Sequence, residues 1–221
     1  MIMRALALFL FLSTPAWGQR AADEDGRAIP DREDVVTLSG GGEITVGFYL
    51  PADYDPEQTY PVIIGPGFFL RDDPAAHGWV VVRAWLGDAG LSRNDRSAVL
   101  DYIDDEINVA GGFRIIGYSA GSGITFQIAG QHNDRFSGVL MIPGHPRRDS
   151  DFDAVSDMTL RFVVGENDGY WLRESRSAHQ RFTDMGADTE LEIVEDGGHV
   201  LIELAGDPLF ERIDRWFRNS D

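Results

Sequence analysis

The chain has 221 residues, of which 43% are hydrophobic and 25% are charged, proportions typical of a globular protein that buries its core within one domain. Its net charge is −18 at pH 7, and this excess of negative charge argues against nucleic acids, anionic polymers and anionic membrane surfaces as partners. The chain has no cysteine, so it can form neither a disulfide nor a lipid-modified cysteine.

The first 18 residues have the pattern of a secretory signal peptide. Arg4 precedes an apolar run at 5–12, which is too short to span a bilayer, and small residues follow it. We expect cleavage near Ala16 or Gly18 and export to the periplasm or the medium, without a stable membrane anchor; a buried N-terminal helix is the alternative. Residues 19–34 are polar and charged, which is typical of a flexible leader.

From residue 35 the hydrophobic pattern predicts alternating strands and helices. Apolar residues at 35–38, and at 44–50 with a period of two, predict an antiparallel hairpin. The sequence predicts buried strands at 60–64, 79–82, 113–116, 138–142, 160–164 and 191–194, and helices at about 95–107, directly after residue 121, around 171–182 and at 209–217. Asn94 and Asp95 are candidate N-caps of the first helix.

This alternation predicts an α/β domain over residues 35–221, with a mostly parallel central sheet, an N-terminal antiparallel hairpin and helices on both faces. The segment 143–159 is the place where related architectures carry a helical cap, and here it is short and acidic. We therefore expect no large cap domain and an open groove.

Gly117-Tyr118-Ser119-Ala120-Gly121 is a G-x-S-x-G pentapeptide between a predicted strand and a predicted helix. This context is that of a nucleophile elbow, a sharp turn that presents a serine oxygen above a sheet. A serine hydroxyl is a weak nucleophile, so acyl transfer needs a base within hydrogen-bond reach and a group that orients this base. Ser119 is therefore the candidate nucleophile.

His199 is the best candidate base among the five histidines, because it follows the last predicted strand in a glycine-rich loop. Backbone freedom in such a loop allows the ring to be aimed across the sheet. His132, at the end of the helix that follows the elbow, is expected to be a surface cap, and His179 an exposed helix residue.

The acid is expected in the loop that follows the preceding strand. Asp168 lies in this loop, in the stretch Gly165-Glu166-Asn167-Asp168-Gly169. Glu166 is an alternative, although it lies closer to the end of the strand. Asp153 and Asp157, in the loop before the predicted strand at 160–164, are the other candidates.

With these residues in order, the chain resembles an α/β-hydrolase over roughly residues 35–219, since Ser119, Asp168 and His199 follow the order of nucleophile, acid and base in that superfamily. Within it, the chain is most similar to compact secreted esterases and depolymerases: the polyhydroxyalkanoate depolymerase, feruloyl esterase and polyester hydrolase groups. The resemblance implies a serine hydrolase that requires no metal and no organic cofactor.

The resemblance also implies an oxyanion hole. In such enzymes one N–H comes from the residue after the nucleophile, here Ala120, and a second from the loop after the third strand. That loop reads Gly65-Pro66-Gly67-Phe68, and a proline has no N–H to donate. Phe68 is therefore assigned as the second donor by position, with Gly67 as the alternative; a plain tight turn without a catalytic task is a further interpretation.

Aromatic and small residues near these loops are candidate substrate-binding groups. We select Gly67 and Phe69 on the oxyanion loop, Tyr118 beside the nucleophile, and Tyr170 and Trp171 directly after the acid loop. Packing in the core is the alternative role for these aromatic side chains.

The sequence thus predicts an exported serine hydrolase that cleaves small or polymeric carboxylic esters through an acyl-enzyme. Amide, peptide and thioester hydrolysis use the same residues and remain alternatives. From another class of function, a non-catalytic periplasmic binding or assembly protein built on a hydrolase fold is the competing interpretation. The sequence indicates neither the acyl group nor the oligomeric state.

Overall fold

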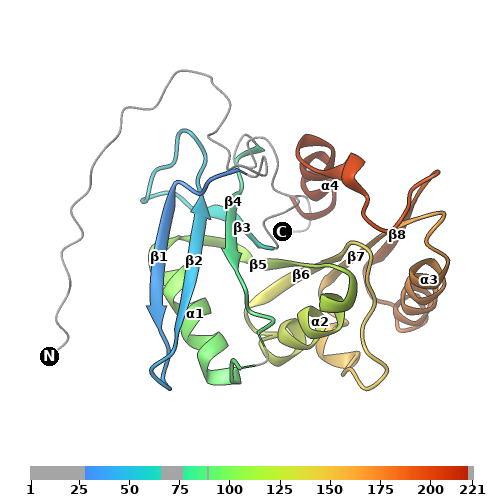
Figure 1. The fold of residues 1–221 in the computed structure, drawn as a ribbon, viewed down its shortest axis with the longest axis horizontal. Helices are drawn as coiled ribbons and strands as arrows, with labels where there is room; N and C mark the ends of the chain where they lie inside the picture. Colours follow the sequence, from blue (N-terminus) through green and yellow to red (C-terminus); the bar gives the residue numbers. More distant parts are fainter. Residues whose placement is uncertain (1–27, 66–76, 89, 219–221) are drawn as a thin grey trace, which may run out of the picture.

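The computed structural model describes residues 28–65, 77–88 and 90–218, and these form an eight-stranded sheet with helices on both faces (Figure 1). The strands lie in the order β1-β2-β4-β3-β5-β6-β7-β8 across the sheet. Their bounds are Arg32–Thr37, Glu43–Tyr49, Tyr60–Ile64, Val80–Ala84, Val109–Gly117, Phe136–Met141, Thr159–Gly165 and Thr189–Val194 for β1 to β8 in sequence order. Figure 1 shows β1 and β2 at one side of the molecule and β8 at the other.

Only the first part of the sheet is antiparallel. Strand β1 pairs with β2, and β2 pairs with β4, in antiparallel register, whereas the pairs from β4 through to β8 are parallel. The predicted hairpin and the predicted parallel sheet are therefore both present. Because parallel strands end at the same edge of a sheet, the loops that follow β5, β6, β7 and β8 come together there.

The folded part begins before residue 35, which was the expected start of the domain. Strand β1 starts at Arg32, and the side chain of Ala28 is buried, with its carbonyl accepting a hydrogen bond from the Tyr49 hydroxyl (3.1 Å). The charged residues of 32–34 alternate in exposure along this edge strand, a pattern that their polarity concealed in the sequence. The predicted signal peptide lies outside the described residues.

The helices divide between the two faces of the sheet. Helices α1 (Arg93–Glu106), α2 (Ser122–Gln131) and α3 (Gly169–Asp184) contribute to one apolar core, and α4 (Asp207–Phe217) contributes to the core on the other face. Helix α4 buries Leu209, Phe210, Ile213, Trp216 and Phe217 on one side, as its periodicity predicts. No helix in the described ranges is long and apolar enough to cross a membrane.

Helix α1 is capped two to three residues before the predicted positions, Asn94 and Asp95. Its N-cap is Ser92, whose hydroxyl accepts from the Asp95 N–H, while the Asp95 carboxylate accepts from the Ser92 N–H (3.0 Å). Asp95 thus occupies the third helical position of a capping box. Its carboxylate also accepts from the Ser39 hydroxyl (2.8 Å), which links α1 to the turn of the hairpin.

The connection between β6 and β7 is short, as predicted. It contains one turn of 3-10 helix, η4 (Asp153–Val155), and no larger insertion. His132, expected at the surface, is instead 4% exposed at the C-cap of α2. Burial lowers the pKa of His132, with a further lowering from the charge of Arg93.

Candidate active site

Ser119 lies at the turn between β5 and α2, in the short 3-10 helix η3 (Ser119–Gly121). Its φ is +50°, a left-handed conformation that is uncommon for a residue with a side chain. The Ser119 N–H donates to the Pro143 carbonyl at the end of β6 (2.7 Å), which fixes the turn against the neighbouring strand. The sequence therefore forms the sharp strand-to-helix elbow that its G-x-S-x-G pattern predicts.

The two glycines of the pentapeptide have different roles. A Cβ atom at Gly117 would lie 2.9 Å from the Met141 sulfur, 3.0 Å from the Thr125 Cβ and 3.1 Å from the Ser122 Cα. A Cβ at Gly121 would meet no described atom within 4 Å apart from those of the adjacent residues and the nearby backbone of its own helix. Only the first glycine is therefore required for the close packing of the elbow against α2 and β6.

The structure brings Ser119, His199 and Asp168 into one chain of hydrogen bonds. The Ser119 Oγ lies 2.8 Å from the His199 Nε2, and the His199 Nδ1 lies 2.6 Å from the Asp168 Oδ2. The Asp168 side chain is 11% exposed and the His199 side chain 37%, so the carboxylate is enclosed while the ring remains reachable from solvent. In this arrangement His199 can accept the serine proton, and Asp168 can hold the other ring nitrogen in its protonated form.

The other candidate acid has a different contact. The Glu166 carboxylate accepts from the Asp196 N–H (3.2 Å), so it supports the backbone of the histidine loop rather than the ring. Asp153 lies in η4, where its carbonyl accepts from Ser156. Among the acids considered from the sequence, Asp168 is the one hydrogen-bonded to His199.

The loops that carry Asp168 and His199 pack backbone against backbone. A Cβ at Gly165 would lie 2.3 Å from the carbonyl oxygens of both Gly197 and Gly198, so only glycine fits there. The Asn167 N–H donates to the Gly197 carbonyl (2.8 Å). This close approach, which requires a glycine at the end of β7, sets the separation of the acid and the base.

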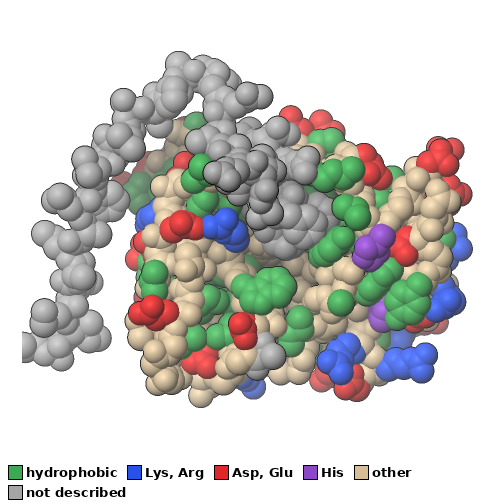
Figure 2. All heavy atoms as spheres, viewed as in Figure 1, with side chains coloured by type: hydrophobic (Ala, Val, Ile, Leu, Met, Phe, Trp, Pro, Cys, Tyr) green, Lys and Arg blue, Asp and Glu red, His purple; other side chains and the backbone are tan. Residues whose placement is uncertain are grey.

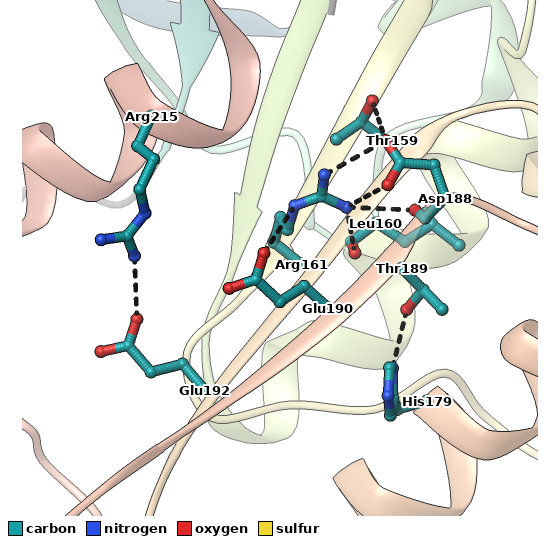
Figure 3. Close-up of polar contacts among 9 residues, drawn as sticks. All are labelled: Thr159, Leu160, Arg161, His179, Asp188, Thr189, Glu190, Glu192 and Arg215. Carbon is teal, nitrogen blue, oxygen red and sulfur yellow. Dashed lines mark hydrogen bonds and ion pairs between the residues drawn. The ribbon is translucent and has the colours of Figure 1, made fainter. Parts of the chain in front are cut away.

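Polar side chains join the strands from which these loops emerge (Figure 3). The Arg161 guanidinium of β7 is nearly buried and pairs with the Asp188 carboxylate (2.9 Å), and it lies 4.0 Å from the Glu190 carboxylate of β8. Burial raises the pKa of Asp188, but the hydrogen bond and charge of Arg161 outweigh this effect and the net pKa is lowered.

Helices on both faces also hold β8. His179 of α3 lies 3.1 Å from the Thr189 hydroxyl, and Arg215 of α4 pairs with Glu192 (3.3 Å), as Figure 3 shows. Strand β8 is an edge strand of the described sheet and pairs only with β7 there. The contacts with α3 and α4 therefore add support from the two faces of the sheet. The His199 loop that follows β8 is held in place accordingly.

Two aromatic rings lie beside His199. The Tyr118 ring and the Trp171 ring each lie 5.7 Å from the imidazole, centroid to centroid. Trp171 in turn lies 5.2 Å from the ring of His145, which approaches the Tyr170 hydroxyl (3.4 Å). Burial raises the pKa of Tyr118, and the charge of Asp168 raises it further. Tyr170 and Trp171 thus lie on the histidine side of Ser119.

A cavity of about 420 Å³ opens beside Ser119. Tyr118, Ser119 and Ala120 line it together with apolar residues from the ends of β3 and β4 and from α2, namely Ile64, Trp85, Leu86, Ile124 and Ile128. Trp85 is 62% exposed at its mouth. Figure 2 shows hydrophobic side chains exposed in the middle of this view of the molecule, with many charged ones toward its margins.

The sequence pattern did not indicate these walls of the cavity. Trp85 and Leu86 follow a buried strand, and Ile124 and Ile128 lie one turn apart on α2, so each had an ordinary explanation as part of the core. The spacing of Ile124 and Ile128 places them on one face of the helix that follows the elbow, and this was the available signal. Tyr170 and Trp171, which were selected instead, do not line the cavity.

Of the two N–H groups assigned to the oxyanion hole, only that of Ala120 belongs to a residue that the structure describes. Ala120 follows Ser119 in η3, where the first backbone N–H groups of a helix have no partner within it and are free to bind an anion. Gly67, Phe68 and Phe69 lie outside the described residues. The Gly65 N–H, at the end of β3, donates to the Val82 carbonyl (3.0 Å).

The sequence matches no protein-family model and no curated protein, but solved structures share the fold. A thermostable esterase is 17% identical with a TM-score of 0.57, over 84% of this chain and 59% of that chain. A dienelactone hydrolase from Anabaena variabilis is 15% identical with a TM-score of 0.61, over 85% of this chain and 97% of that one. Further esterases, among them a ferulic acid esterase, are similar as well.

Peptidases are also among the similar structures. Dipeptidyl peptidase 4 from Porphyromonas gingivalis is 16% identical with a TM-score of 0.61, over 83% of this chain but only 34% of that chain. The chain thus spans less than two thirds of the length of this peptidase and of the thermostable esterase. At such identities the comparisons show the fold alone: the chain has the α/β-hydrolase fold, and its described residues include no large cap domain.

Proposed function

We propose that the protein is a hydrolase of carboxylic esters in which Ser119 is the nucleophile, His199 the general base and acid, and Asp168 the group that orients the histidine. The observation that carries this proposal is the hydrogen-bonded chain from the Ser119 Oγ through both nitrogens of His199 to the Asp168 carboxylate. Structural similarity to several esterases supports the reaction class.

The reaction proceeds in two halves. His199 Nε2 takes the proton of Ser119 as its oxygen attacks the ester carbonyl, and the resulting oxyanion is stabilised by the Ala120 N–H and a second donor, which we assign to Phe68. The imidazolium, paired with Asp168, then protonates the leaving alcohol as the C–O bond breaks. Water, deprotonated by the same nitrogen, attacks the acyl-enzyme and releases the acid and the free serine.

The cavity beside Ser119 is suited to the acyl part of the ester. Its described walls are mainly aliphatic and aromatic, and burial of apolar surface contributes roughly 25 cal/mol per Å². We propose that short and medium acyl chains or an aryl group occupy it. A series of p-nitrophenyl esters of increasing acyl length tests this assignment, and the expected result is a rise and then a fall of kcat/KM once the chain exceeds the cavity.

The Ser119→Ala variant is the central test. It is expected to lower kcat/KM for p-nitrophenyl butyrate by a factor of about 10⁴ or more and to abolish labelling by a fluorophosphonate probe. Ser156→Ala, which changes a serine in the loop between β6 and β7, is the matched control and is expected to retain both. Hydrolysis by Ser119→Ala at the rate of the unaltered protein would refute the mechanism.

Ester and amide hydrolysis use the same three residues, and the fold is shared with a dipeptidyl peptidase. Matched ester and anilide substrates with the same acyl group separate the two reactions. The ester is expected to be cleaved with the larger kcat/KM. Failure of the probe to label Ser119 at all would favour a non-catalytic binding or assembly role instead.

We also propose that the protein is exported, on the pattern of residues 1–18. Expression of the full chain in a bacterial host and N-terminal sequencing of the product test this point. The expected mature chain begins at Trp17 or Gln19. Recovery of an intact N-terminus from the cytoplasm would contradict the export proposal and leave the reaction proposal unaffected.

A further inference from the structure

Positive charge gathers at one place in this acidic molecule. The 19 basic residues are all arginines and are outnumbered by 37 acids. Several described arginines are held in ion pairs, such as Arg135 with Asp101 (2.6 Å) and Arg212 with Glu192 (2.7 Å). Figure 2 shows basic side chains grouped beside a histidine at the lower right of this view.

A second cavity, of about 280 Å³, lies between the loop that follows β6 and helix α3. We call it the arginine pocket. Its lining includes His145, Arg147, Arg148, Phe152, Glu174 and Arg181. Three arginines therefore border one concave surface together with one glutamate.

The charges of these arginines are largely available. Within the described ranges, the side chains of Arg148 and Arg181 form no ion pair or hydrogen bond, and Arg147 reaches Asp149 only at 3.5 Å. The carboxylate of the pocket, Glu174, is itself paired with Arg173 (2.9 Å). The net charge that borders the pocket is therefore positive.

The packing beneath the pocket directs these side chains. The Arg181 guanidinium lies over the Phe152 ring, 3.4 Å from its centroid, which orients it by a cation–π contact. The stem of Arg147 packs on α2, since a Cβ at Gly123 would lie 2.6 Å from its Cγ. Packing thus orients Arg147 and Arg181, and planar guanidinium groups suit recognition of an oxygen anion.

The pocket is connected to the candidate active site through aromatic rings. His145 lines the pocket, and its ring contacts Trp171, which contacts His199. The backbone of His145 is fixed as well, because the Ser122 Oγ contacts both its N–H and its carbonyl (3.2 Å each). An anion bound in the pocket would therefore lie two ring contacts away from His199, outside the acyl cavity.

We propose that the arginine pocket binds an oxyanion group, a carboxylate or a phosphate, at a site distinct from the acyl cavity. Planar guanidinium groups pair with both groups in the same geometry, so the two ligands share one recognition chemistry. The anion is either an acidic substituent at a remote end of the ester substrate or a free anion. The first of these sources rests on the proposed ester hydrolysis, and the binding itself does not.

Binding is tested on the full chain with inorganic phosphate and with malonate, by titration calorimetry at low and constant ionic strength. Saturable binding is expected, and the double variant Arg148→Gln/Arg181→Gln is expected to weaken it by about tenfold or more. Arg176→Gln, which removes an arginine of α3 that does not line the pocket, is the matched control and is expected to bind as the unaltered protein does. Circular dichroism and Tm verify that each variant is folded.

Absence of saturable binding of both probes, or equal binding by the double variant, would overturn the proposal. Ser119→Ala is expected to bind phosphate normally, so failure of the proposed reaction and failure of the anion site are distinguishable. The source of the anion is determined by comparing the KM values of two esters that differ only by a terminal carboxylate. A lower KM for the acidic ester that disappears in the double variant assigns the anion to the substrate, whereas an unchanged KM ratio together with phosphate binding assigns it to a free anion.

Discussion

Asp168 shows how one side chain sets the state of another. Its carboxylate accepts from the His199 Nδ1 at 2.6 Å and so leaves Nε2 unprotonated and directed at the Ser119 oxygen. An amide at position 168 can instead donate to Nδ1, which favours the wrong tautomer. Asp168→Asn is therefore expected to lower kcat by about 10⁴ while the protein stays folded, as measured with a p-nitrophenyl ester and by Tm.

Glu166→Gln is the matched control for this prediction. Glu166 lies in the same loop but contacts the Asp196 N–H, and an amide oxygen can accept from that N–H as well. Its kcat is expected to remain within a few-fold of the unaltered protein. A loss in Glu166→Gln as large as that in Asp168→Asn would show that loop geometry, rather than the tautomer of His199, determines the effect.

The glycines of the pentapeptide allow a second test at single residues. Gly117→Ala places a methyl group against Met141, Thr125 and Ser122, and such overpacking is expected to lower the free energy of unfolding by about 1–3 kcal/mol. Gly121→Ala meets open space at an ordinary helical φ of −74°, and it is expected to leave stability unchanged or raise it by up to about 1 kcal/mol. Urea unfolding of both variants measures the difference, and equal losses would contradict the packing described at the elbow.

At the scale of elements, hydrophobic periodicity predicted the strands and helices well, because the spacing of apolar residues reflects which faces of a helix or strand are buried. The boundaries depended on polar contacts. Strand β1 starts at Arg32 because its backbone pairs with β2, which lies outside a local window of sequence. Helix α1 starts after Ser92 because Asp95 completes a capping box there, and this Ser-x-x-Asp pattern is local and was a signal in the sequence.

The contribution of the N-terminal cap of α1 to the free energy of unfolding is expected to depend on pH. Hydrogen bonds from Ser92, then from Ser39, lower the pKa of Asp95 to about 2 from its ordinary value of 3.8. A pKa that is lower in the folded state means that the carboxylate contributes stability above the unfolded value and that this contribution is lost as the pH falls through the folded value. The difference in unfolding free energy between the unaltered protein and Asp95→Asn is therefore expected to shrink as the pH falls from about 4 toward 2.

Urea unfolding across this pH range measures that difference. Asp105→Asn removes an exposed carboxylate from the same helix and is the control for the general effect of charge on an acidic protein. The expected difference between Asp105→Asn and the unaltered protein is smaller than that of Asp95→Asn. A constant difference for Asp95→Asn at every pH would mean that the Ser39 and Ser92 hydrogen bonds do not depend on the charge of the carboxylate.

At the scale of the whole molecule, the sequence could identify the residues brought together by strand ends but not the walls of the cavity. Ser119, Asp168 and His199 each follow a strand of one parallel sheet, so their meeting at one edge follows from topology. The cavity instead combines β3, β4 and α2, and Trp85 and Ile124 carry no signal that separates a wall from a core. The arginine pocket was missed for the same reason, since Arg148 and Arg181 lie far apart in sequence and meet only across the loop and α3.

The short connection between β6 and β7 leads to a prediction about how the proposed ester hydrolysis depends on the state of the substrate. A helical cap at this position would cover the site, whereas this connection holds a single 3-10 turn and the side chain of Ser119 is partly exposed. The hydrolysis rate is therefore expected to follow simple saturation as the concentration of tributyrin is raised through its solubility limit. A steep rise in rate at that limit would mean that another segment covers Ser119 in solution, and the same assay with a detergent-dispersed substrate would then show whether the interface removes it.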